Sequence, residues 1–251
     1  MADVRLIPCL SDNYAVLVHA GDETVLVDAP EEGPIAAALA KTGWTLTTVL
    51  ITHHHPDHVD ALPAVRGTAK VVGPAGEADR IKGLDETVGD GAHFTLGPLD
   101  VQVIETPGHT SGPASYFMPG AGLAFTADTL FAMGCGRLFE GDAATMWASF
   151  LKLRAALPDE TQIFCGHEYT LTNARFAAQT LPDDAAIAER FATISAMRER
   201  GEPTVPTTMA LEKATNPFMR ADDPAVASAL GMAGAEPAAV FAKLRQGRDG
   251  F

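Results

Sequence analysis

The stretch Thr52-His53-His54-His55-Pro56-Asp57-His58 decides how this chain is interpreted. It places four imidazoles and a carboxylate directly after 47–52, a β-branched run that predicts a strand. Histidine and aspartate are ligands that suit Zn²⁺, Mn²⁺ or Fe, and a single ion would not use so many of them. We therefore expect a site for two metal ions at the carboxyl end of a strand.

The spacing inside this stretch divides its ligands into two pairs. His53 and His55 are two residues apart, so in extended backbone they point the same way. Asp57 and His58 follow Pro56, which suits the first turn of a helix, so they lie beyond a turn and can face a second ion. A lone histidine is more often a surface or core residue than a ligand. This cluster is internal and contains an aspartate, which favours metal binding.

Three further donors lie where other predicted strands end. They are His109, Asp128 and His167. Open α/β sheets place ligands at the edge where strand ends meet, and loops held by rigid strands can fix metal donors. Together with the cluster, these residues complete two coordination spheres.

The pattern along the chain predicts a layered α/β protein followed by a helical part. Strands are expected at 13–19, 23–28, 47–52, 70–72, 101–105, 115–117, 123–126 and 161–165. Helices are expected at 33–41, 143–157, 174–181, 185–200, 224–231 and 237–245. No strong strand signal follows residue 170.

Composition narrows the choice of partners. The chain of 251 residues has 18 Lys and Arg against 32 Asp and Glu, a formal net charge of -14, which argues against a nucleic-acid partner. An anionic ligand would require a local basic cluster. The N-terminal residues resemble no export signal and no segment is apolar enough to span a bilayer, so we expect a cytoplasmic monomer without membrane contact. Three cysteines then predict reduced thiols.

The ligand set resembles that of the metallo-β-lactamase superfamily, whose signature is His-x-His-x-Asp-His followed by separate His, Asp and His ligands. The resemblance implies a four-layer αββα sandwich with a smaller carboxyl-terminal helical domain. It also implies how the ligands are shared between two ions: His53, His55 and His109 for the first, Asp57, His58 and His167 for the second, and Asp128 for both. His54 is left as a residue that supports the ligands or packs.

Within the superfamily, the chain resembles the glyoxalase II (hydroxyacylglutathione hydrolase) family from Asp12-Asn13-Tyr14 nearly to its last residue. The stretches 134–141, 166–170, 216–220 and 244–251 are typical of that family. The resemblance implies residues 1–169 as a metal-binding domain and 170–251 as a helical domain that contributes to glutathione binding. Glutathione contacts are implied for Arg137, Phe139, Tyr169, Arg245 and Arg248.

Four positions depart from the family pattern. Val59-Asp60-Ala61 replaces two glycines, Ala127 replaces a glycine before the aspartate that both ions share, Phe139 stands where some members have tyrosine, and Pro113 replaces a frequent histidine. None of these changes removes a ligand. They are expected to affect metal preference or substrate affinity rather than to abolish activity.

The expected reaction is hydrolysis of an S-(2-hydroxyacyl)glutathione thioester such as S-D-lactoylglutathione. Two divalent ions lower the pKa of a shared water to about 7, so hydroxide attacks the acyl carbon and glutathione leaves. Asp57 and Asp128 are the expected catalytic ligands, and Asp57 orients the hydroxide. Zn²⁺ is the expected metal, with Fe and Mn²⁺ as alternatives.

Other activities stay open at this point. A persulfide dioxygenase shares the scaffold but uses one iron, and a lactonase or β-lactamase shares the fold. The typical glyoxalase II stretches argue against all three. A metal-binding scaffold without catalysis is the alternative from another class. Cys135 and Cys165 as nucleophiles are disfavoured because no separate histidine is available to activate them.

Overall fold

The structure is a computed structural model that describes residues 2–251, so Met1, where the first predicted domain begins, lies outside the described residues. The chain divides into two compact units. Unit 1 comprises the described part of Met1–Glu105 together with Thr110–Ala127, and unit 2 comprises Thr106–His109 and Asp128–Phe251. The two units are described separately below.

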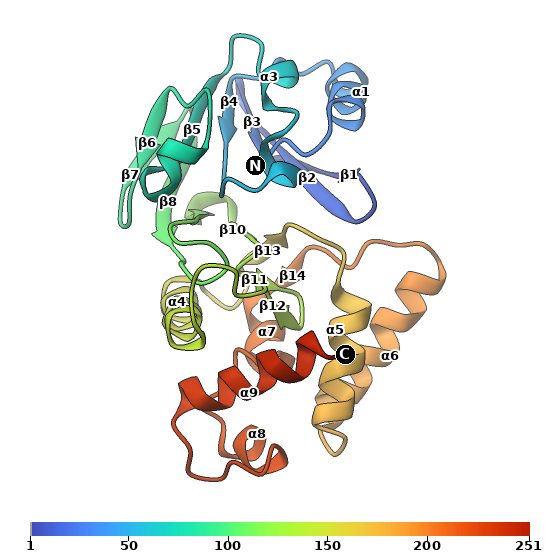
Figure 1. The fold of residues 1–251 in the computed structure, drawn as a ribbon. Coiled ribbons are helices and arrows are strands. Elements are labelled where there is room, and N and C mark those ends of the chain that lie inside the picture. The colour runs from blue at the N-terminus through green and yellow to red at the C-terminus, as the bar shows by residue number, and fades with distance from the viewer. Residues whose placement is uncertain (1) are drawn as a thin grey trace. The chain divides into compact units, whose positions relative to one another are not determined.

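Unit 1 contains a mixed sheet of six strands in sequence order (Figure 1). The strands are β1 (Asp3–Cys9), β2 (Asn13–Ala20), β3 (Glu23–Val27), β4 (Thr48–Leu50), β5 (Lys70–Pro74) and β6 (Glu86–Val88). β1, β2 and β3 pair antiparallel, and β3 to β6 pair parallel. The turn between β2 and β3 needs Gly21, which has a φ of 61°. The predicted hairpin is therefore confirmed.

Short helices connect the parallel strands of this sheet. They are α1 (Glu32–Thr42), α2 (Pro56–Val59), α3 (Leu62–Val65) and the 3-10 helix η1 (Ala75–Arg80). α1 ends at Gly43, whose φ of 72° allows its N–H to bond the carbonyl of Leu39. Ile35 of α1 and Leu62 of α3 join Leu26 and Ile51 in one buried cluster. This cluster fixes the strand end from which the histidine stretch begins.

Unit 1 also contains four antiparallel strands of a second sheet. They are β7 (His93–Leu96), β8 (Leu99–Glu105), β9 (Ala114–Met118) and β10 (Leu123–Ala127), with the 3-10 turn η2 (Pro119–Ala121) before β10. The two sheets are tied by hydrogen bonds at the histidine stretch. The buried Tyr116 hydroxyl donates to the carbonyl of Ile51 at 2.7 Å, and the Ala114 N–H donates to the carbonyl of Thr52 at 2.9 Å.

Unit 2 consists mainly of helices with two short strand pairs. The strands are β11 (Leu130–Phe131), β12 (Gly134–Cys135), β13 (Gln162–Cys165) and β14 (Thr207–Thr208). The helices are α4 (Ala143–Ala156), α5 (Thr170–Thr180), α6 (Ala185–Glu199), α7 (Met209–Thr215), α8 (Pro224–Ala229) and α9 (Pro237–Asp249). The core of unit 2 includes Phe241 of α9, whose ring lies 5.3 Å from Phe150 of α4 and 5.4 Å from Phe218.

Most predicted elements are confirmed, with shifts at their ends. α5 begins four residues before the predicted 174, and α9 continues to Asp249 rather than ending at 245. The elements β1, β6, β7, β11, β12, β14, α3, α7, η1 and η2 were not predicted. Among residues 2–251, no helix is both long and apolar enough to cross a membrane.

Candidate metal centre and substrate residues

Unit 1 contains the four predicted ligands of the histidine stretch. His55 has extended backbone, with a φ of -62° and a ψ of 144°, and precedes Pro56 at the first position of α2. The imidazoles of His53 and His58 are almost fully buried. The predicted helix start at Pro56 is confirmed, and it separates the first pair of ligands from the second.

Asp28, directly after β3, determines which ring nitrogen carries the hydrogen in His53 and His58. Its carboxylate accepts from Nδ1 of His58 at 2.7 Å and from the Thr52 hydroxyl at 2.8 Å. Because the Thr52 hydroxyl donates to Asp28, it accepts from Nδ1 of His53 at 3.0 Å. Both histidines therefore carry hydrogen on Nδ1 and present the lone pair of Nε2, as metal-binding histidines do.

Sequence reasoning missed the role of Asp28. The residue is buried and has a φ of 58°, a left-handed conformation that aspartate adopts more readily than most non-glycine residues. An acid at the end of a hydrophobic strand was the only signal in the sequence, and its partner His58 is 30 residues away.

The other two predicted ligands of unit 1, His55 and Asp57, lie beside His53 and His58. Nδ1 of His55 is 3.1 Å from Nε2 of His53, a separation that suits two nitrogens bound to one ion at about 2.0–2.1 Å each. Asp57 is held by Asn13, whose side-chain amide donates to Oδ2 of Asp57 at 3.0 Å and to its carbonyl at 3.1 Å. Oδ2 of Asp57 is 3.9 Å from Nε2 of His58. The stretch thus presents two pairs of neighbouring donors.

Unit 2 brings together the three predicted ligands that are distant in sequence. Oδ2 of Asp128 is 3.5 Å from Nε2 of His109 and 3.3 Å from Nε2 of His167. All three side chains are buried. Nδ1 of His109 donates to the carbonyl of Arg137 at 2.8 Å, which leaves the lone pair of Nε2 facing Asp128. An acid whose oxygen faces two imidazole nitrogens suits a ligand shared by two ions.

Glycines allow the backbone to pass close to these ligands. A Cβ on Gly136 would lie 1.8 Å from the carbonyl oxygen of Asp128 and 3.2 Å from Nδ1 of His109. Gly108 has a φ of 142°, and a Cβ there would lie 2.9 Å from the Cα of Met146. Substitution of either glycine would displace a ligand-bearing segment.

The five predicted substrate residues all belong to unit 2. The ring of Tyr169 stacks on the imidazole of His167, with 4.7 Å between the ring centroids. The exposed ring of Phe139 contacts the imidazole of His109 edge-on at 5.2 Å. Two of the predicted glutathione contacts therefore adjoin predicted metal ligands of the same unit.

The three arginines form a positive cluster. Burial and the neighbouring guanidinium groups of Arg245 and Arg137 lower the pKa of Arg248 from its ordinary value. Nε of Arg248 donates to Oδ1 of Asn173 at 3.0 Å, which fixes its side chain. Like charges at this range are unfavourable unless an anion joins them, so the cluster suits a carboxylate ligand.

Arg245 also has a structural role that sequence reasoning did not foresee. It is 5% exposed, and its guanidinium donates to the carbonyl of Cys135 at 2.7 Å and to Asp249 at 2.9 Å. These bonds hold the segment that leads to Arg137.

The cysteines are poor nucleophiles in this fold. Cys9, Cys135 and Cys165 are buried and have free thiols. Burial raises the pKa of Cys135 to about 11 and that of Cys165 to about 12. Because the thiolate is the reactive form, neither thiol suits catalysis at neutral pH.

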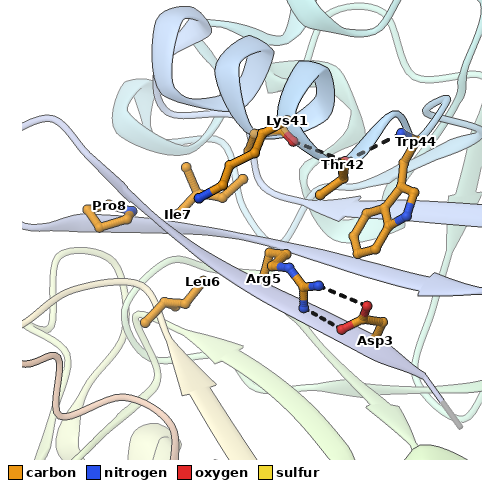
Figure 2. Close-up of a pocket in the computed structure, with 9 residues that line it drawn as sticks. Asp3, Arg5, Leu6, Ile7, Pro8, Lys41, Thr42 and Trp44 are labelled. Atoms are coloured by element: carbon orange, nitrogen blue, oxygen red, sulfur yellow. Dashed lines mark hydrogen bonds and ion pairs between the residues drawn. The ribbon is translucent and has the colours of Figure 1, made fainter.

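A separate pocket of about 550 Å³ lies in unit 1 between β1 and α1 (Figure 2). Trp44, Arg5 and Lys41 are among its lining residues. Arg5 is paired with Asp3 and lies over the Trp44 ring at 5.2 Å. None of the predicted ligands or substrate residues lines this pocket.

Two family models together match residues 10–251. Residues 10–167 match the family model described as metallo-beta-lactamase superfamily, and residues 168–251 match the model described as hydroxyacylglutathione hydrolase C-terminus. A hydroxyacylglutathione hydrolase of Ruegeria pomeroyi is 51% identical over 99% of both chains. One of Rhizobium meliloti is 52% identical over 99% of this chain and 98% of its own.

Solved structures show the same fold. ETHE1 from Myxococcus xanthus is 27% identical with a TM-score of 0.68, covering 97% of this chain and 90% of its own. The BLEG-1 B3 metallo-beta-lactamase is 23% identical with a TM-score of 0.66, covering 86% and 99%. The predicted fold class, an α/β sandwich with a helical carboxyl-terminal domain, is confirmed.

Proposed function

Because this chain belongs to the hydroxyacylglutathione hydrolase (glyoxalase II) family of the metallo-β-lactamase superfamily, we propose that it hydrolyses S-(2-hydroxyacyl)glutathione thioesters such as S-D-lactoylglutathione. Water adds its oxygen to the acyl carbon, the C–S bond breaks, and the products are glutathione and a 2-hydroxy acid. The observation that carries this proposal is full-length similarity to enzymes of that name, with every predicted metal ligand present.

We propose the same ligand assignment as the family resemblance implies. One ion is held by His53, His55 and His109, the other by Asp57, His58 and His167, and Asp128 serves both. Groups of three such His and Asp side chains could hold a metal ion. The proposal is supported within each unit by buried imidazoles, three of which have Nδ1 committed to an oxygen acceptor. A fixed Nδ1 hydrogen orients the ring and makes Nε2 a better ligand.

A pair of such ions, when bound, makes hydroxide available near neutral pH and stabilises negative charge on a carbonyl oxygen. The protein's own groups do the positioning. Asn13 holds the carboxylate of Asp57 at 3.0 Å, so Asp57 can orient the attacking water. We assign Asp57 and Asp128 as the catalytic carboxylates: Asp57 orients the water, and Asp128 serves both ions.

We propose Zn²⁺ as the resident metal. A set of imidazoles and carboxylates also accepts Fe and Mn²⁺, so availability in the cell contributes to the choice. TTHA1623, a structure with 23% identity and a TM-score of 0.62, was solved in a di-iron-bound form. Iron is therefore the first alternative to test.

We propose that glutathione is bound by Arg137, Phe139, Tyr169, Arg245 and Arg248. Glutathione has two carboxylates, and the three guanidinium groups supply positive charge in a chain whose formal net charge is -14. Phe139 offers an apolar ring where a hydroxyl is found in some relatives. Thus Phe139 is expected to contribute contact area but no hydrogen bond.

The assignment of residues 1–169 to metal binding and of residues 170–251 to glutathione binding stays a prediction. The two compact units have other bounds than these two ranges. The cytoplasmic location and the monomeric state also stay predictions. Size-exclusion chromatography with light scattering would test the monomer.

One experiment on a single purified sample tests the proposed function. Metal content per chain is measured together with the hydrolysis of S-D-lactoylglutathione. About two ions per chain and release of glutathione thiol are expected. Two ions without thioester hydrolysis would overturn the proposal. Oxygen consumption with glutathione persulfide and one iron per chain would instead support the dioxygenase alternative.

A matched pair of variants separates catalysis from folding. Asp128→Ala is expected to abolish hydrolysis while circular dichroism retains the helical signal. Asp159→Ala removes an exposed carboxylate of the same unit, paired only at the surface with Lys213 at 2.7 Å, and is expected to retain wild-type hydrolysis.

A further inference from the structure

Glu77 is a buried acid that the predicted metal site does not include. It lies in η1 and is 1% exposed. Its Oε2 accepts from the backbone N–H of His54 at 2.7 Å and from Nδ1 of His54 at 2.6 Å. Its Oε1 accepts from the Thr110 hydroxyl and from the Gly112 N–H at 3.3 Å. Four donors match the lone pairs of an ionised carboxylate, so both oxygens are occupied.

His54 is oriented from both sides of its ring. An arginine only donates hydrogen bonds, and Arg80 contacts Nε2 of His54, so Nε2 accepts. Nδ1 therefore carries the hydrogen and donates to Glu77. His54 cannot offer the same lone pair to a metal, which explains why it is not needed as a ligand. It acts instead as an anchor in the middle of the stretch 53–55.

The second segment bonded to Glu77 is in direct backbone contact with η1. A Cβ on Gly76 would lie 3.0 Å from the Cα of Gly112, and a Cβ on Gly112 would lie 2.8 Å from the Cα of Gly76. Only glycine at both positions permits this approach. It brings the neighbouring Glu77 within reach of Thr110, the residue that follows His109 in the chain.

We propose that Glu77 is a positioning residue for one of the two metal ions. It anchors His54, which lies between His53 and His55, and it anchors Thr110, which follows His109. His53, His55 and His109 are the three imidazoles assigned above to one ion. The inference therefore rests on the proposed ligand assignment. Among the hydrogen bonds that Glu77 accepts in residues 2–251, none comes from Asp57, His58 or His167, the ligands assigned only to the other ion.

Asn13 is expected to support the other ion, the one that Glu77 does not support. It is buried, and its side-chain amide bonds both Oδ2 and the carbonyl of Asp57, a ligand of the second ion. Glu77 and Asn13 thus form a pair of supports, one for each ion. Loss of a group that orients metal ligands typically weakens metal binding by about 10- to 100-fold.

The test is metal retention by the full-length, metal-loaded chain in increasing chelator, measured as ions per chain. Glu77→Ala is expected to release one ion at about 10- to 100-fold lower chelator and to keep the other as the wild type does. Asn13→Ala should also lose one ion selectively, and the double variant should lose both. Wild-type retention of both ions by Glu77→Ala, or their simultaneous release, would overturn the inference.

Two further variants separate positioning from general destabilisation. Glu77→Gln keeps the size of the side chain and can still accept from His54, so it should retain the ion better than Glu77→Ala. Glu212→Gln removes another buried carboxylate, which pairs with Arg190 and bonds Thr207 and Met133 of unit 2. It should lower the melting temperature and leave metal retention unchanged. The same selective ion loss in Glu212→Gln would show a generic effect and overturn the inference.

This readout is independent of the reaction. A wild-type chain that holds two ions but leaves S-D-lactoylglutathione intact would overturn the proposed function only. The positioning role of Glu77 would then still be decided by the ion that its variants lose.

Discussion

The phenol ring of Tyr169 lies parallel to the imidazole of His167, with 4.7 Å between the ring centroids and 6° between the planes. Phe131 contacts both rings edge-on, at 5.3 Å from Tyr169 and 5.9 Å from His167. A predicted metal ligand and a predicted glutathione contact are therefore packed as one aromatic group. Substitutions of Tyr169 should therefore affect both the kinetics of hydrolysis and the retention of metal.

Tyr169→Phe keeps the stacked ring and removes the hydroxyl. We expect KM for the glutathione thioester to rise about 2- to 10-fold with kcat unchanged, because one hydrogen bond is worth about 0.5–1.5 kcal/mol. Tyr169→Ala also removes the ring from His167 and should release metal at lower chelator concentration. Steady-state kinetics and chelator titration separate the two effects. A fall in kcat for Tyr169→Phe without a change in KM would contradict the prediction.

Arg248→Met should weaken substrate binding through loss of charge. A hydrogen bond to a charged group is worth about 1.5–3 kcal/mol, so KM should rise at least tenfold. Because the attraction is electrostatic, added salt should raise KM in the wild type more than in the variant. Lys243→Met, which removes an exposed cation from the same helix, is the matched control and should leave KM nearly unchanged. Equal KM values for both variants would argue against the cluster.

The buried thiols predict a loss of stability at alkaline pH. Burial raises the pKa of Cys135 to about 11 and of Cys165 to about 12. The unfolded thiols titrate near 8.5, so the folded state binds protons more tightly above that pH. Their contribution to stability is therefore complete below about pH 8.5 and is lost as pH rises towards 11 and 12. Urea unfolding between pH 7 and 10 should show the decline.

Cys165→Ala supplies the control for this pH effect. The variant should have a smaller decline of unfolding free energy above about pH 8.5, because one titrating group is removed. It should retain thioester hydrolysis, since the thiol takes no part in the proposed reaction. A variant that loses hydrolysis but keeps its metal would revive the cysteine mechanism.

Ala127 is a strained position at the end of β10. Its φ is 39°, in the left-handed region that costs a non-glycine residue about 1–2 kcal/mol. Ala127→Gly relieves this cost but adds freedom to the unfolded chain, so the unfolding free energy should rise by about 1 kcal/mol or less. Ala127→Val should lower it by more than about 1 kcal/mol, because β-branched residues tolerate positive φ poorly. Equal stability of both variants would contradict the assigned backbone conformation.

The departure at Ala127 shows what can and what cannot be predicted from the sequence. Comparison with the family pattern identified the missing glycine, but only the backbone angle explains why glycine is common there. The effects expected of the other departures, at Val59-Asp60-Ala61 and Pro113, stay predictions. Asp60 is exposed at the end of α2, where its N–H donates to the carbonyl of Pro56.

Local signals determined the elements that carry the ligands. The strand before His53, the helix start at Pro56 and the hairpin at Gly21 follow from residue types a few positions apart. β1 escaped prediction because Ile7 breaks the alternation of apolar and polar residues and Pro8 argues against a strand. It lies at the edge of its sheet, where proline is tolerated, and this position is known only once the strands are paired.

The family resemblance and the residue types and spacing of the predicted ligands can be inferred from the sequence, because imidazoles and carboxylates at strand ends carry their chemistry wherever the strands lie. The tertiary structure alone decided which side chains hold those ligands. Asp28 reaches His58 across 30 residues, and Glu77 reaches Thr110 across 33. The supporting role of a buried acid depends on its partners in space, and no local pattern in the chain records them.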